Sequence, residues 1–85
     1  MTRLDKAKER LKSIPRDYTY SEARYLLGRL GFEESNKGKT SGSRVKFYRP
    51  ADDRIILLHR PHLSDIMSYG AVRGLAEYLR GLGEI

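Results

Sequence analysis

The sequence predicts an α+β domain in which three antiparallel strands carry helices on one face. Two segments with apolar residues at helical spacing, residues 20–30 and 69–82, enclose a block with strand-like alternation. Turn residues divide that block into separate strands, and a further amphipathic segment precedes the first of the two helices. The expected order of elements is therefore helix, helix, strand, strand, strand, helix.

Residues 3–13 are expected to form the N-terminal helix, which ends before Pro15. Its apolar residues recur at spacings of three and four: Leu4, Ala7, Leu11 and Ile14. Because this stripe is narrow, we expect the helix to dock on the rest of the domain or on a partner. Residues 1–17 are thus interpreted as an N-terminal helical extension, and residues 18–85 as the α-β-β-β-α domain.

The helix over residues 20–30 has a start and a stop signal. Thr19 and Glu22 have the spacing of a capping box, in which each side chain bonds the other residue's backbone amide. Gly31 follows the last apolar residue, as is typical of the residue after a helix C-cap. One face of the helix is apolar: Ala23, Leu26, Leu27 and Leu30.

Three strands are expected after this helix, and their bounds follow from alternation and turn residues. They are Phe32–Asn36, Ser43–Arg49 and Arg54–His59. Residues 37–42 form a loop by composition, and Pro50–Asp53 suits a type I turn. After Pro61 a connection leads to the last helix, expected from Tyr69 to Leu82.

The four-residue turn sets a hairpin register in which Arg49 pairs with Arg54. Arg44 then lies opposite His59, and Lys46 lies opposite Leu57. In this register four apolar residues face the helices: Val45, Phe47, Ile56 and Leu58. The opposite face is basic at one end and apolar in its middle: Arg44, Lys46, Tyr48, Ile55, Leu57 and His59. An RNA strand, a partner protein or the N-terminal helix could cover such a face, or it could be a solvated face with cross-strand pairs.

Composition narrows the class of protein. The 85 residues form one domain, and a formal charge of +6 favours an anionic partner, with nucleic acid first, although a lysine-rich surface explains the charge equally well. The absence of cysteine excludes disulfides and thiolate metal sites. No apolar run has the length of a membrane span and the first twelve residues are charged, so we expect a cytoplasmic protein that does not bind membranes.

The candidate site combines phosphate-binding and proton-transfer groups. RNA cleavage by internal attack needs a base, an acid and positive charge at the phosphate. His59 and Arg44 are the candidate catalytic residues. His59 is the acid or base, because the guanidinium of Arg44 opposite it favours a neutral imidazole, and Arg44 holds the phosphate. The remaining candidates would bind RNA: Lys37, Lys39, Ser41, Ser43, Lys46, Tyr48 and His62. Alternatively, His59 and His62 order the sheet end and the following loop, and Tyr48 simply packs.

Other chemistries fit the residues poorly. The two histidines are separated by Arg60 and Pro61 and the acidic residues are scattered, so we expect no metal and no cofactor. The Gly38-Lys-Thr40 triplet lacks the leading glycine of a Walker motif and enters a strand, which argues against a nucleotide site.

The chain resembles the HicA (YcfA-like) toxins of bacterial toxin–antitoxin modules over about residues 18–82. The segments that carry the resemblance are Leu30-Gly31-Phe32, the loop and strand from Lys37 to Arg49, Leu58 to His62, and Tyr69 to Leu75. The resemblance implies a fold like a double-stranded RNA-binding domain and a metal-independent endoribonuclease, a hydrolase acting on mRNA. It also implies a HicB-like antitoxin as partner.

One position departs from the family pattern. HicA-like toxins usually carry a catalytic histidine just after the Gly42-Ser43 pair, where this chain has Arg44 or Val45. Either His59 supplies the base from the neighbouring strand, or cleavage is weak or absent. The N-terminal helix is extra to the family pattern and would cover the open face or mediate a homodimer. A non-catalytic RNA-binding module and a protein-interaction domain are the alternative functions.

Overall fold

The computed structural model describes residues 1–35 and 44–85 of the chain. It contains three helices and one three-stranded sheet, in the order α1 (Arg3–Lys12), α2 (Tyr20–Arg29), β1 (Glu33–Ser35), β2 (Arg44–Arg49), β3 (Arg54–His59) and α3 (Tyr69–Gly81). The strands are antiparallel and lie in the order β1-β2-β3. The predicted α+β class and order of elements are confirmed.

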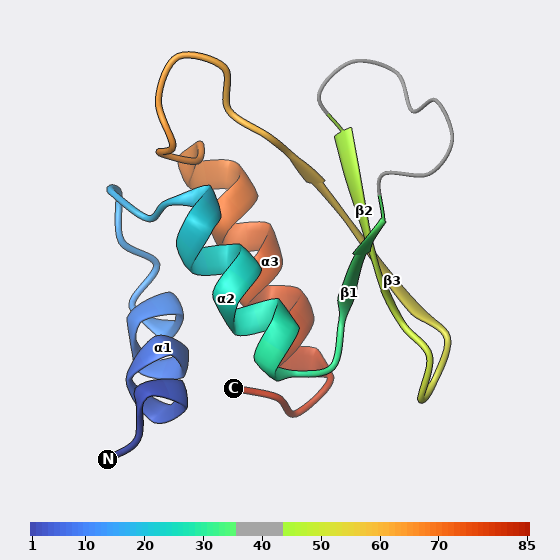
Figure 1. Ribbon diagram of the computed structural model, residues 1–85. Helices are drawn as coiled ribbons and strands as arrows, with labels where there is room; N and C mark the ends of the chain where they lie inside the picture. The colour runs from blue at the N-terminus through green and yellow to red at the C-terminus, as the bar shows by residue number, and fades with distance from the viewer. Residues whose placement is uncertain (36–43) are drawn as a thin grey trace.

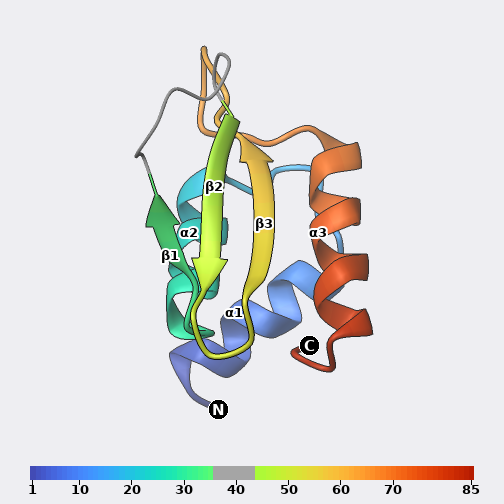
Figure 2. The ribbon, with the colours of Figure 1, turned by 90° about the vertical axis from the view of Figure 1, so that its right-hand side faces the viewer.

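The elements form three layers (Figure 1). Helices α2 and α3 lie side by side against one face of the sheet, and α1 lies on the far side of these two helices. Figure 2 looks onto the opposite face of the sheet, which no helix covers. The N-terminal helix therefore does not cross the open sheet face, and that alternative is wrong. It docks on the domain instead: Leu11 of α1 is fully buried in the core.

Side-chain caps and left-handed residues set the helix ends. The predicted capping box at Thr19 and Glu22 begins α2, and a second box at Thr2 and Asp5 begins α1. After α2, Gly31 has a φ of 95°, and the Phe32 amide donates to the Leu27 carbonyl at 2.9 Å. This is a Schellman motif, and glycine is favoured because other residues strain at a positive φ.

The hairpin register is the predicted one. Arg44 pairs with His59, Lys46 with Leu57 and Arg49 with Arg54. The four predicted inward residues are all buried: Val45, Phe47, Ile56 and Leu58. In the turn Asp53 has a φ of 56°, a conformation that aspartate tolerates better than most residues. The first strand begins at Glu33, one residue later than predicted, and Phe32 lies in the core before it; the predicted end at Asn36 lies outside the described residues.

Arg49 fastens the hairpin to the ends of both covering helices. Its guanidinium donates to the Leu30 carbonyl at the end of α2 and to the Glu84 carboxylate beyond α3, at 3.2 and 2.8 Å. It also bonds Asp52 twice and lies over the Phe32 ring. Because α-helix C-termini carry partial negative charge, a cation is favoured here. These bonds orient the strands relative to the helices.

Among the helices of the described residues, none is long and apolar enough to span a membrane.

Candidate functional site

The open face of the sheet brings together six of the residues that the register predicts there. Strand β2 contributes Arg44, Lys46 and Tyr48, and β3 contributes Ile55, Leu57 and His59. Ile55 and Leu57 keep 47% and 52% of their surface exposed, and they are neighbours on this face of β3. Exposed apolar residues beside cations suit a partner with both apolar and anionic groups.

Lys46 provides the most clearly uncompensated charge on this face. It lies between Ser35 of β1 and Leu57 of β3, and no carboxylate pairs with it within residues 1–35 and 44–85. Arg44 and His59 face each other at the next cross-strand position on the same face, and both are exposed. The strand end near the start of β2 is therefore the basic end of the open face.

Tyr48 lies toward the opposite end of the face, next to the turn. Its hydroxyl donates a hydrogen bond to the Asp53 carboxylate, and this bond raises the pKa of Tyr48. The hydroxyl is thus already engaged, and Glu33 of β1 lies opposite it on the neighbouring strand. The partly exposed ring remains available for stacking on a flat group such as a base, which is one way in which Tyr48 would make the RNA contact predicted for it.

The two histidines line one hollow, of about 310 Å³, where β3 leads into the connection to α3. Its other walls include Met67, Ser68 and Ala71. Both imidazoles belong to exposed residues, so solvent and substrate reach them. From sequence, His62 was expected to contact RNA or to order the loop. Its place in one hollow with His59 was not predicted, because the path of the connection after Pro61 has no periodic signal.

The connection that carries His62 is tied to the start of α2. The Tyr20 amide donates to the Asp65 carbonyl at 2.7 Å, and the Met67 amide donates to the Tyr18 carbonyl at 2.9 Å. The Ser21 hydroxyl and amide bond the Asp65 carboxylate, which lowers the pKa of Asp65. These bonds fix the connection at residues 65–67 and thereby limit the positions available to His62.

Glu34 of β1 joins its own strand to α2 and to the residue that follows β3. Its carboxylate accepts from the Tyr20 hydroxyl at 2.7 Å and pairs with Arg24 and with Arg60 at 3.0 and 3.3 Å. Burial and the Glu34 bond raise the pKa of Tyr20 to about 12. The ion pair with Glu34 holds the side chain of Arg60, the residue that follows His59. The role of Glu34 was not predicted from the sequence, although Glu34 pairs with Phe47 and therefore shares its inward phase.

Four of the predicted RNA contacts lie outside the described residues: Lys37, Lys39, Ser41 and Ser43. They stay predictions.

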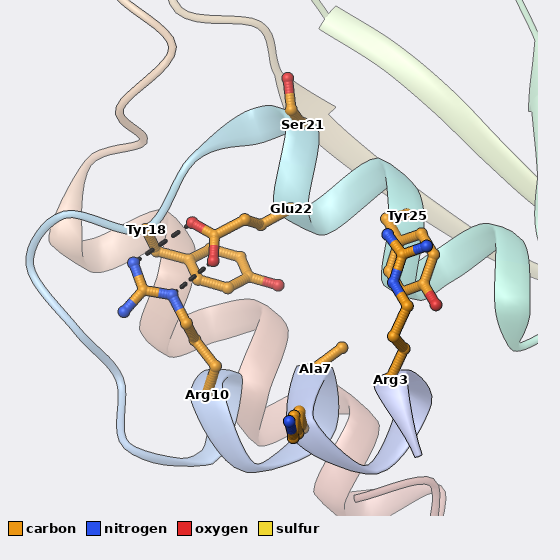
Figure 3. Close-up of a pocket in the computed structure, with 8 residues that line it drawn as sticks. Arg3, Ala7, Arg10, Tyr18, Ser21, Glu22 and Tyr25 are labelled. Atoms are coloured by element: carbon orange, nitrogen blue, oxygen red, sulfur yellow. Dashed lines mark hydrogen bonds and ion pairs between the residues drawn. The ribbon is translucent and has the colours of Figure 1, made fainter.

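A larger hollow, of about 460 Å³, lies between α1 and α2, away from the sheet (Figure 3). The Arg10 guanidinium forms two hydrogen bonds with the Glu22 carboxylate across it, and Arg3 lies over the Tyr25 ring at 4.9 Å. The Arg10 bond lowers the pKa of Glu22, and burial raises the pKa of Tyr18. Arg10 and Glu22 satisfy each other, so this hollow is better explained as the seam that fastens α1 to α2.

The chemistry open to the sheet face is proton transfer and anion binding. No cluster of three histidine, aspartate or glutamate side chains that could hold a metal ion occurs in the part of the chain that the structure describes. Comparisons of the chain with protein-family models, with curated proteins and with solved structures find no match.

Proposed function

We propose that this protein is a HicA-like toxin: an RNA-binding, metal-independent endoribonuclease that acts on mRNA in the cytoplasm and is neutralised by a HicB-like antitoxin. In this proposal its domain is a variant of the double-stranded RNA-binding fold. The α2-β1-β2-β3-α3 order and the helices on one sheet face support that assignment. The additional helix α1 lies behind the helical layer and leaves the open face available.

The cross-strand pair of Arg44 and His59 is the observation that carries the proposal. It joins a cation and a proton-transfer group on the exposed face, with Lys46 two residues along the same strand. A phosphodiester needs both: positive charge at its non-bridging oxygens and a base near the attacking hydroxyl. Ile55 and Leu57 also favour RNA over water as the neighbour of this face, because the apolar faces of bases would cover these exposed side chains.

The proposed reaction is attack by the ribose 2′-hydroxyl on the adjacent phosphorus. His59 takes the hydroxyl proton, an O2′–P bond forms, and the P–O5′ bond breaks. The leaving 5′-oxygen receives a proton from the second histidine in the hollow, His62, so that the products are a 2′,3′-cyclic phosphate and a 5′-hydroxyl. Arg44 and Lys46 stabilise the charge that develops on the phosphate oxygens. The reaction uses no metal, oxidant or external nucleophile.

A second candidate function is RNA binding without cleavage. The observation in its favour is that Arg44 occupies the part of β2 where HicA-like toxins usually carry their catalytic histidine. An arginine there strengthens the hold on the phosphate but transfers no proton at neutral pH. In this case His59 and His62 contact the RNA only, and toxicity would arise from sequestering message.

An RNA incubation in EDTA separates the two candidates. The purified protein is mixed with end-labelled single-stranded RNA, and both the cleavage products and the bound fraction are measured. We expect fragments that end in a 2′,3′-cyclic phosphate, with the rate reduced about 100-fold or more in His59→Ala. Binding without cleavage supports the second candidate. Cleavage unchanged in His59→Ala removes the proposed mechanism, and the absence of both cleavage and binding refutes both functions.

The toxin role has its own test in cells. Induced expression of the chain in bacteria should arrest growth, and co-expression of the adjacent gene should relieve the arrest. His59→Ala expressed to the same level is the matched control. Normal growth at full expression contradicts the toxin role, whatever the protein does to RNA in the test tube.

A further inference from the structure

The outer side of β3 is an unprotected sheet edge. Strand β3 pairs with β2 on one side and has no strand partner on the other within the described residues. Natural edge strands are usually short, or carry lysine, proline or a bulge that blocks further pairing. This edge has six residues, and Ile55 to Leu58 contain neither charge nor proline. Its outward backbone groups can therefore accept a further strand.

A hollow of about 330 Å³ runs along this edge, between β3 and α3. Its strand wall extends from Ile55 to His59, and its helix wall includes Ala71, Gly74 and Tyr78. Their spacing of three and four residues places these three residues on one face of α3, next to the face that packs in the core. Figure 2 shows α3 beyond the β3 edge. Small residues at two of these positions leave the room that a side chain from another chain would occupy.

Gly74 is an open position in the helix wall of the hollow. A Cβ atom added at Gly74 meets no other atom within 4 Å, so the glycine is not required by close packing. Its φ is also helical, which excludes a conformational need. Tyr78, one turn further along α3, keeps 37% of its surface exposed and offers an aromatic wall.

We propose that the β3 edge and this hollow bind an extended segment of a partner protein, which adds to the sheet as a fourth strand. Alternate side chains of the segment would enter the hollow against Gly74 and Tyr78, and the others would lie over the open face beside Ile55 and Leu57. The segment is apolar at its centre and acidic at the end beside His59. The inference goes beyond the proposed function and requires no RNA binding.

Charge determines the choice of occupant. At the His59 end of the edge Arg44 lies across the hairpin, whereas the next cation in the chain, Arg60, is already paired with Glu34; the whole protein has a charge of +6. A second copy of β3 added in antiparallel fashion would place its own Arg54 at that end, close to the cross-strand pair of Arg44 and His59. Like charges directly opposite each other are unfavourable in sheets. An acidic partner segment is favoured for the same reason.

The test uses a synthetic peptide with valine and isoleucine at alternate positions and two acidic residues at one end. Its affinity is measured by calorimetry for the parent, for Gly74→Gln and for Gly28→Gln. Gly28 lies on the exposed side of α2, and a Cβ there also meets nothing within 4 Å, so Gly28→Gln adds the same side chain at an open helical position away from the hollow. We expect Gly74→Gln to weaken binding at least about tenfold, because its side chain fills the hollow, and Gly28→Gln to bind like the parent.

Two further probes separate strand addition from other modes of binding. A peptide N-methylated at alternate amides cannot pair with the edge and should not bind, and a lysine-ended peptide should bind more weakly than the acidic one. Equal binding by Gly74→Gln and the parent overturns the proposal, as does equal binding by the methylated peptide. Failure of the parent to bind the acidic peptide overturns it too. Self-association of the parent that Gly74→Gln abolishes would assign the edge to a second copy and reject the partner segment.

Discussion

Removing the charge of Lys46 should make RNA binding less sensitive to salt. Lys46 is the sheet-face cation with no carboxylate partner in the described part of the chain, and its neighbours across the sheet are Ser35 and Leu57. Binding to a single-stranded RNA releases about 0.7 counterion per neutralised phosphate. If Lys46 neutralises one phosphate, Lys46→Ala lowers the slope of log K against log salt by about 0.7. A fourfold rise in salt then weakens the variant roughly 2.6-fold less than it weakens the parent.

The assay is fluorescence anisotropy of a labelled single-stranded RNA, titrated at several salt concentrations. Lys6→Ala is the matched control, because it makes the same change in net charge, from +6 to +5, on α1 behind the helical layer. We expect the Lys6→Ala slope to equal that of the parent. An unchanged slope in Lys46→Ala, or an equal fall in both variants, would refute the assignment of the open face, since binding would then follow the overall charge.

Three further predictions concern the scaffold. Leu11→Ala should lower the free energy of unfolding by about 2–5 kcal/mol, because Leu11 is fully buried. Lys12→Ala, at an exposed position, should change it by no more than about 0.5 kcal/mol. Denaturant unfolding measures both variants, and equal losses would contradict the docking of α1. Arg49→Met should cost about 2 kcal/mol in the same assay, more than Arg54→Met on the exposed neighbouring position, because Arg49 bonds both helix ends. The pKa of Glu22 is lowered in the folded protein, so ionised Glu22 stabilises the fold at pH values above the ordinary glutamate pKa. This stabilisation is lost as the pH falls through the lowered pKa, and the difference in Tm between the parent and Glu22→Gln should therefore shrink below about pH 4. A difference that stays constant with pH would contradict this prediction.

The sheet face could be predicted from sequence because two independent signals agree on it. Val45 and Phe47 set which side of β2 is apolar, and the four-residue turn sets which residues of β3 lie opposite. The capping box at Thr19 and the glycine at Gly31 likewise determine both ends of α2 through local hydrogen bonds. These features depend on residues close together in the chain, where pattern and structure correspond directly.

Features that depend on contacts between distant segments could not be predicted. The narrow apolar stripe of α1 predicts that Leu11 is buried, but it does not show against which surface. Glu34 joins α2, β1 and the residue after β3, and nothing in its own strand indicates those partners. The hollow shared by His59 and His62 depends on the path of an irregular connection, which is fixed by hydrogen bonds to the start of α2. Arg49 had a usable signal, since it continues the inward phase of Phe47.

The most direct measurement of the central claim is an NMR titration of the labelled protein with a short single-stranded RNA. The account predicts that amide signals from Arg44 to Tyr48 and from Ile55 to His59 shift with RNA concentration, while those of α1 remain in place. Saturating RNA that shifts the α1 and α2 signals around the seam at Arg10, and leaves the sheet signals unchanged, would contradict it.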